Sequence, residues 1–261
     1  MNVAIIISGR IELYHHVVKD NYERIINPLI DAGHTVNIFM SVWEHSGVND
    51  LVESYKDQTK VVDIETFTEY TRGLMDNLNE YENLTAQYGN SKAHKVANTL
   101  FWLYKLKRGY KLVQEYERVN NMKHDLYIRL RPSATVVLPL DVNQLSELDD
   151  DSIYAYEDNV IRVDGVLHGC GNGWIDDNFC IARNRPFELF WGVYDNIVDL
   201  CNRSQSGISH ILLQTQFQIN NIKIVKPNSP LIMYRLSEDG SRWSQYYHFT
   251  YFYPWFKLPV L

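Results

Sequence analysis

The chain has 261 residues, of which 45% are hydrophobic and 22% are charged, and its formal net charge is −7. This length and apolar content suit a globular α/β protein with a full core. The acidic balance argues against broad nucleic-acid binding, which needs a basic surface that replaces the counterions of the phosphates. The longest apolar runs, such as residues 3–7, are too short to cross a bilayer.

Cysteine use and the N-terminus indicate the compartment. Cys170, Cys180 and Cys201 are odd in number and show no Cys-x-x-Cys spacing, which argues against a disulfide framework or a zinc site. A reducing setting is the simpler interpretation. The opening "MNVAIIISGR" lacks a basic leader start and soon becomes polar, so it predicts a first β-strand and not a signal peptide. We therefore expect a cytoplasmic protein with no membrane span.

The first elements in chain order predict a β-α-β unit. Residues 2–10 are a short continuous apolar run that ends in Ser-Gly, as is typical of a central parallel strand. Apolar side chains near a 3.6-residue period predict a helix over 14–32, and a second strand follows over 35–43. The short connections favour parallel strands with a right-handed crossover. Residues 60–67 predict a third, short strand, which enters a polar region over 68–90.

The middle of the chain predicts a long helix that leads into another strand. The apolar stripe over 98–120 indicates the helix, which Gly109 should weaken locally. The strand follows over 125–131. Residues 138–151 predict a short helix or turn, and residues 152–158 a further strand.

The last part of the chain predicts a less regular half. Residues 163–175 are rich in glycine and indicate a mobile loop, and 176–201 predicts a short strand and then a helix. A further helix over 208–221 precedes the last core strand, over 222–228. The tail from Tyr234 is dense in aromatic residues and could line a groove, mediate dimerisation or, as we prefer, cover an edge of the core.

These elements predict the α/β class, with a mainly parallel central sheet flanked by helices. We expect a single domain over 1–261 with a Rossmann-like nucleotide-binding half over 1–140. Residues 141–261 would form the second, acceptor-binding half. In open α/β sheets, ligands bind beyond the carboxyl ends of the strands, so the strand ends are where candidate site residues are sought.

The first strand ends in Ser8, Gly9 and Arg10. The glycine would let the backbone approach a ligand, and Arg10 would lie at the carboxyl edge of the sheet. A glycine at this point also commonly just makes a turn. No G-x-G-x-x-G fingerprint and no P-loop occurs anywhere in the chain.

The mid-chain strand carries Arg129 and Arg131 and then breaks at Pro132. Side chains two residues apart on a strand share one face, and two like charges on a buried face are costly without an anion nearby. A diphosphate would meet this need, because guanidinium forks match phosphate oxygens bidentately. The alternative is that both arginines pair with acids from neighbouring helices, and the sequence leaves the two open.

Acidic residues give two further candidates. Asp176 and Asp177 precede an apolar strand, where a carboxylate could act as a general base toward a hydroxyl nucleophile; an Asp-Asp pair is equally a plain turn or cap signal. His168 is a secondary base candidate or a solvated loop histidine. Residues 147–152 contain Asp-x-Asp, which could bind a divalent cation, but a solvated turn is the favoured interpretation.

The order of these features resembles the glycosyltransferases of GT-A type, in particular the bacterial and large-virus set that includes the WavE lipopolysaccharide-synthesis proteins. The resemblance covers residues 3–235, and the stretches that carry it are "VAIIISGR", "HDLYIRLRPSATVVL" and "GWIDDNFCIARNRPFELF". It implies a hexosyl- or pentosyltransferase that moves a sugar from a nucleotide-sugar donor to a hydroxyl of a carbohydrate acceptor, with a nucleotide sugar and a glycan as partners. The residues that it places at the donor and acceptor are Ser8, Gly9, Arg10, Arg129, Arg131 and Ser133 for the nucleotide sugar, and Asp177 or Asp176 as the base.

Ser133 is a departure, because the pattern that the chain resembles carries an acid after Arg-x-Arg-Pro. Enzymes of GT-A type commonly hold Mn²⁺ or Mg²⁺ with an Asp-x-Asp motif near this point. Three alternatives follow: metal-independent transfer in which arginines neutralise the leaving group, a metal held by other acids, or a non-catalytic member. His210 is a second departure, since the resemblance implies an acid near that helix start. The alternative functions are an inactive nucleotide- or glycan-binding module and another transferase with a phosphate-bearing donor.

Overall fold

The structure is a computed structural model that describes residues 1–11, 13–66, 96–157, 160–162, 175–225, 231–236 and 242–247. The predicted polar region over 68–90, His168 and most of the predicted glycine loop lie outside these residues, as does the aromatic tail beyond Tyr247. Within the described ranges, none of the helices combines the length and the apolar character that a membrane span requires.

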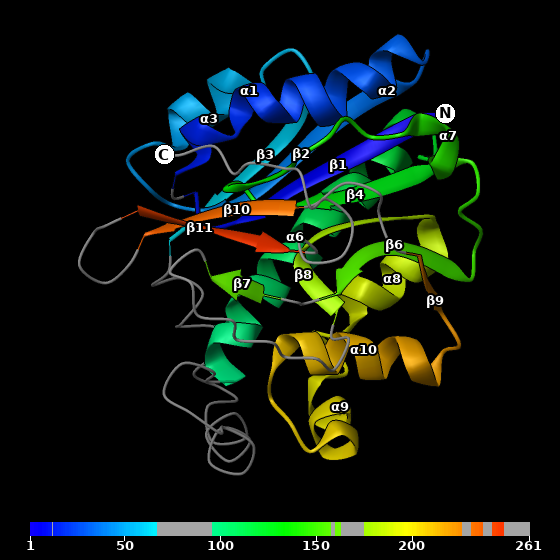
Figure 1. The fold of residues 1–261 in the computed structure, drawn as a ribbon. Helices are drawn as coiled ribbons and strands as arrows, with labels where there is room; N and C mark the ends of the chain where they lie inside the picture. The colour runs from blue at the N-terminus through cyan, green and yellow to red at the C-terminus, as the bar shows by residue number, and fades with distance from the viewer. Residues whose placement is uncertain are drawn as a thin grey trace.

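A seven-stranded sheet in the order β3-β2-β1-β4-β8-β6-β9 forms the centre of the fold (Figure 1). Its strands are β1 (Asn2–Gly9), β2 (Thr35–Trp43), β3 (Thr59–Glu65), β4 (Leu126–Leu130), β6 (Ser152–Glu157), β8 (Ile175–Ala182) and β9 (Lys223–Val225). Neighbouring strands from β3 to β4 are parallel, and β6 pairs with β9 in parallel. Only β8 runs against its neighbours β4 and β6 among these described strands. The predicted α/β class with a mainly parallel sheet is therefore confirmed.

The predicted helix over 14–32 is helical along its length but not one regular helix. It consists of the 3₁₀ turn η1 (Tyr14–His16), α1 (Val18–Asn21), the π-helical turn η2 (Tyr22–Ile26) and α2 (Asn27–Asp31). Pro28 stands in the first turn of α2 and has no backbone N–H to continue the regular pattern, so the wider turn lies just before it. The parallel β1–β2 pairing that this crossover connects is confirmed over the full length of β1.

Helices cover both faces of the sheet, as Figure 1 shows. One apolar cluster joins the sheet to η2, α2 and α3 (Val48–Ser54), through side chains such as Leu29 and Leu51. The other joins it to α6 (Val96–Asn120), α8 (Asn184–Gly192), α9 (Ile197–Ser204) and α10 (Ser209–Ile219), with Leu103, Phe187 and Leu213 among its members. Side chains alternate between the two clusters along β1, as the period of a strand requires.

Gly109 has a packing role that the sequence did not indicate. A Cβ atom at this position would lie 2.5 Å from Cγ2 of Ile6 on β1. The glycine therefore allows α6 to lie close against the central strand. The long helix itself is confirmed, and the expectation that Gly109 only weakens it is incomplete.

The C-terminal half is more regular than the sequence predicted. The helix expected up to residue 201 is two helices: α8 ends at Gly192, and α9 begins at Ile197. The predicted turn before β6 contains α7 (Val142–Leu145). A second sheet has the order β5-β10-β11-β7, and the sequence patterns missed it. Its strands are β5 (Ala134–Val136), β7 (Val160–Arg162), β10 (Leu231–Leu236) and β11 (Arg242–Tyr247).

Candidate functional site

The reversed direction of β8 brings the candidate residues together. The carboxyl ends of β1 and β4 lie at one edge of the central sheet, and the start of the antiparallel β8 lies at that same edge. Arg129 pairs with Cys180 in the ladder, and the N–H of Arg131 donates to the carbonyl of Asn178 at 2.9 Å. Asp176 and Asp177 therefore lie beside the two arginines, although some 45 residues separate them along the chain.

Arg129 is a buried cation, and some of its hydrogen-bond donors have no partner among the described residues. Its side chain is 2% exposed, and neither Nε nor Nη1 has a hydrogen-bond partner among the described residues. Burial lowers the pKa of Arg129 to about 10, with Asp177 opposing that shift and Arg131 adding to it. The guanidinium is thus charged at neutral pH, near acids, and incompletely hydrogen-bonded. This is the arrangement in which a buried polar group calls for a ligand or a specific explanation.

Arg131 is held partly by the protein itself. Its Nη1 donates to Oδ1 of Asn178 at 3.3 Å, and Nδ2 of Asn178 donates in turn to Oδ1 of Asp176 at 2.5 Å. The N–H of Ala134 donates to the carbonyl of Arg131 at 3.0 Å, which closes a turn through Pro132 and Ser133. Proline favours the second position of such a turn, so local chain reversal accounts for the Pro-Ser break.

The other predicted nucleotide-sugar residues differ in their surroundings. Ser8 is fully buried, and its Oγ has no hydrogen-bond partner in the described part of the chain. Gly9 has a φ of 114°, a conformation that favours glycine, and no atom of the described residues lies within 4 Å of a Cβ placed there. Arg10 is exposed, and Ser133 is 2% exposed in the turn after β4. Within the described ranges, Ser8 and Arg129 are therefore two buried side chains at this edge that have polar atoms without a hydrogen-bond partner.

The two acids at the start of β8 have different partners. Asp176 is fully buried, and its two oxygens accept from the N–H and the side-chain amide of Asn178. Asp177 is partly exposed, and its Oδ2 accepts from the hydroxyl of Ser209 at 2.9 Å. Burial raises the pKa of Asp177, but His210, Ser209 and the two nearby arginines together outweigh it, so the pKa lies below its usual value. Asp177 is accordingly ionised at neutral pH.

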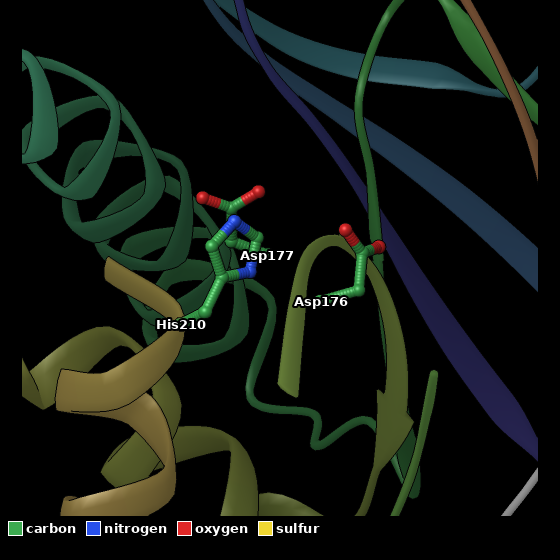
Figure 2. Close-up of side chains that lie close together, drawn as sticks. All are labelled: Asp176, Asp177 and His210. Atoms are coloured by element: carbon green, nitrogen blue, oxygen red, sulfur yellow. The ribbon is translucent and has the colours of Figure 1, made fainter. Parts of the chain in front are cut away.

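His210 adds a third ligand-type group to this pair. Its Nδ1 lies 2.8 Å from the carbonyl oxygen of Ile175, at the start of the same strand. Figure 2 shows the side chains of Asp176, Asp177 and His210 converging from β8 and α10. One ligand atom from each of the three lies within 4.8 Å of those of the other two. The sequence singled out His210 only as a departure from the resembled pattern, because nothing in the chain order shows that the first turn of α10 meets the start of β8.

The remaining candidates have structural explanations. The Asp-x-Asp of residues 147–152 forms an exposed turn, in which a carboxylate oxygen of Asp149 accepts from the N–H of Asp151 at 3.0 Å and Asp151 pairs with Arg185. The favoured solvated turn is thus confirmed. Cys180 and Cys201 are buried free thiols, and burial raises the pKa of both, that of Cys201 to about 11. Neither thiol is activated as a nucleophile.

Comparisons with known proteins give only distant similarities to solved structures. Neither a protein family nor a curated protein matches the sequence. Mouse xyloside xylosyltransferase 1 in its apo form is 9% identical, with a TM-score of 0.41 over 87% of this chain and 85% of that chain. The glycosyltransferase GlyE of Streptococcus pneumoniae is 11% identical, with a TM-score of 0.37 over 86% of this chain and 45% of GlyE, and its apo form gives 10%, 0.35, 85% and 44%. This chain therefore spans less than half of GlyE.

Proposed function

We propose that the protein is a glycosyltransferase, which moves a hexosyl or pentosyl unit from a nucleotide-sugar donor to a hydroxyl of a carbohydrate acceptor. The observation that carries the proposal is Arg129: a buried guanidinium at the carboxyl edge of a mainly parallel sheet, with Nε and Nη1 unpartnered among the described residues. That edge is where open α/β sheets bind their ligands.

A diphosphate is the ligand that suits this guanidinium best. A buried charge without full compensation is costly, so a group that satisfies Arg129 has a large free-energy advantage over water. Guanidinium donors match phosphate oxygens in geometry and charge. The same contact would grow stronger as negative charge develops on a leaving diphosphate, which is the kind of interaction that accelerates the transfer. Ser8 supplies one further hydroxyl at the edge, and Gly9 supplies an uncrowded backbone.

Asp177 is the better of the two acids for contact with the acceptor. Both oxygens of Asp176 already accept from Asn178, whereas Asp177 is partly exposed. An ionised carboxylate can accept the proton of an attacking hydroxyl when the two lie within hydrogen-bond reach. Arg10, Arg131 and Ser133 are proposed to line the donor side with Ser8 and Gly9. The assignment of residues 1–140 to the donor and 141–261 to the acceptor, and the cytoplasmic location, stay predictions.

Two features favour a second candidate, a nucleotide- or glycan-binding module without catalysis. The low pKa of Asp177 makes its carboxylate a weak base, and Ser133 replaces the acid that the resembled pattern carries. Donor binding with no turnover under any metal condition would support this module over the enzyme. Turnover with a different phosphate-bearing donor class would instead support another kind of transferase.

Thermal-shift screening of the purified chain against UDP, GDP, CMP and TDP sugars, with and without Mn²⁺, tests the proposal. A ligand that binds only the native state raises the melting temperature. We expect one donor class to do so in the wild type, and Arg129→Gln and Arg131→Ala to abolish or reduce the shift. Arg203→Ala is the matched control, since Arg203 lies on α9 and pairs with Asp199 in solvent. Equal shifts in all four proteins would contradict the phosphate role of the arginines.

A further inference from the structure

The ring of His210 has a fixed protonation pattern at Nδ1. A backbone carbonyl oxygen can only accept, so the 2.8 Å contact with Ile175 requires a proton on Nδ1. The other ring nitrogen, Nε2, then carries either a lone pair or a second proton. This Nδ1–H···O=C contact is the one that commonly orients a histidine whose Nε2 binds a metal.

The two neighbouring carboxylates favour a cation at this point. One ring nitrogen of His210 and one oxygen of each acid lie within 4.8 Å of one another, so the negative oxygens repel each other and any lone pair on that nitrogen. A divalent cation shared by an imidazole nitrogen and two carboxylate oxygens removes that repulsion. Three protein ligands also leave coordination positions open, as catalytic metal sites require.

We propose that Asp176, Asp177 and His210 form a binding site for a divalent transition-metal cation. At bond lengths near 2.1 Å, tetrahedral or cis ligands of one ion lie roughly 3 Å apart, so side chains whose ligand atoms lie within 4.8 Å of one another close on the ion by about 1–2 Å. A carboxylate has about four lone-pair sites, and the two contacts from Asn178 use two of those of Asp176. The imidazole ligand favours Mn²⁺, Co²⁺ or Zn²⁺ over Mg²⁺ and Ca²⁺, which prefer oxygen alone.

Arg129 gives an independent reason to expect a ligand here. Its electrostatic partners include Asp177 and Asp176, and two of its nitrogens have no hydrogen-bond partner in the described chain. Two acids and two arginines balance each other, so a bound dication leaves an excess of two positive charges. A diphosphate neutralises that excess and satisfies Arg129 at once. Cation and diphosphate should therefore bind cooperatively; this coupling rests on the proposed function, whereas the cation site rests on the three ligands.

The cation site changes the part that Asp177 plays. One oxygen of Asp177 would hold the cation beside the donor phosphates, which leaves the other oxygen for the proton of the acceptor. Ser209 and Asn178 become positioning residues, because they donate to Asp177 and Asp176 and fix the orientation of the two carboxylates.

Titration of the full-length, metal-stripped chain with Mn²⁺, followed by the electron paramagnetic resonance signal of the free ion, tests the site. We expect one saturable site per chain, which Zn²⁺ displaces and Mg²⁺ at equal concentration does not. His210→Asn retains a donor for the Ile175 carbonyl but has no Nε2, and Asp177→Asn retains an acceptor for Ser209 but loses the charge. Each should weaken Mn²⁺ binding at least tenfold.

His34→Ala is the matched control, because His34 lies at the opposite edge, just before the start of β2, and should leave Mn²⁺ binding unchanged. Circular dichroism melting of each variant identifies any that does not fold. Absence of saturable binding in the wild type, or equal binding in the wild type and both site variants, would overturn the site.

The coupling has a separate test that distinguishes its failure from that of the proposed function. In the presence of Mn²⁺, the affinity for pyrophosphate should rise by a factor on the order of 5 to 150, the usual range of coupling between sites. Mn²⁺ binding without any donor binding would leave the cation site standing and contradict the transferase. Donor turnover in EDTA would leave the transferase standing and contradict the cation's role.

Discussion

The backbone N–H of Arg131 donates to the carbonyl oxygen of Asn178 at 2.9 Å, and the side chains of the same two residues meet at 3.3 Å. This double contact joins the end of β4 to the start of the antiparallel β8. Because Asn178 also donates to Asp176 through its backbone and its side chain, one asparagine fixes a cation and an anion of the candidate site relative to each other.

Asn178→Ala should therefore affect both stability and binding. The change removes the hydrogen bond that Nδ2 of Asn178 donates to the buried Asp176, and the loss of a hydrogen bond to a charged group costs about 1–3 kcal/mol. We expect the free energy of unfolding in urea to fall by that amount and donor affinity to fall with it. Asn196→Ala is the control, since Asn196 is exposed and bonds only to a backbone carbonyl. An unchanged stability would show that Asp176 does not depend on Asn178.

Gly109→Ala should destabilise the protein although alanine is the better helix former. The propensity gain is about 1 kcal/mol, whereas a Cβ 2.5 Å from Cγ2 of Ile6 overpacks a core contact at about 1–3 kcal/mol. Ile6→Ala combined with Gly109→Ala should recover part of the loss, and a double-mutant cycle measures this coupling. Additive effects of the two changes would contradict the steric explanation.

Buried Lys105 should contribute far more to stability than exposed Lys56. Its Nζ lies 2.6 Å from Oε2 of Glu65 and 4.5 Å from the centroid of the Trp43 ring, with the side chain fully buried. Lys105→Met leaves the partly buried Glu65 without its cation, whereas Asp63 keeps its pair with Arg108 at 2.8 Å. Breaking a buried pair costs about 3 kcal/mol or more. Lys56→Met, which removes an exposed pair with Glu53, should cost less than about 1 kcal/mol. Equal losses in urea denaturation would contradict this assignment.

His124 should make the protein less stable at mildly acidic pH. Burial lowers its pKa from 6.5, with Glu117 opposing the shift. Below pH 6.5 the histidine is therefore protonated more readily in the unfolded chain than in the folded chain. The free energy of unfolding consequently has its full value above pH 6.5 and falls as the pH drops below it. The slope reaches at most about 1.4 kcal/mol per pH unit for one proton. Urea unfolding between pH 7.5 and 5.5 measures it, and His124→Gln should flatten the profile. An unchanged profile in the variant would exclude His124 as the cause.

The strands were predictable where a buried strand is mainly apolar, and β1, β2, β4 and all of β8 except its first residue fall in segments predicted as strands. The close packing at Gly109 was not predictable, since it depends on what surrounds the chain in space, and the π-helical turn before Pro28 was also not predicted, although the proline accounts for it. The second sheet was missed for the same reason: β5, β7, β10 and β11 are short and come from distant parts of the chain.

The site was predictable by residue type but not by arrangement. Arg129 stood out as a charge on a buried strand, and Asp176 and Asp177 as acids before one. That these groups meet depends on the antiparallel direction of β8, which alternation of apolar residues does not encode. His210 joins them only through the packing of α10 on β8, and so its spacing along the chain carried no signal.

The most direct test of the central claim is a calorimetric titration of inorganic pyrophosphate into the wild type, Arg129→Gln and the control Arg203→Ala, each with and without Mn²⁺. The account predicts saturable binding in the wild type and the control, and at least a tenfold loss in Arg129→Gln. Wild-type affinity in Arg129→Gln, with a native circular dichroism spectrum, would contradict it.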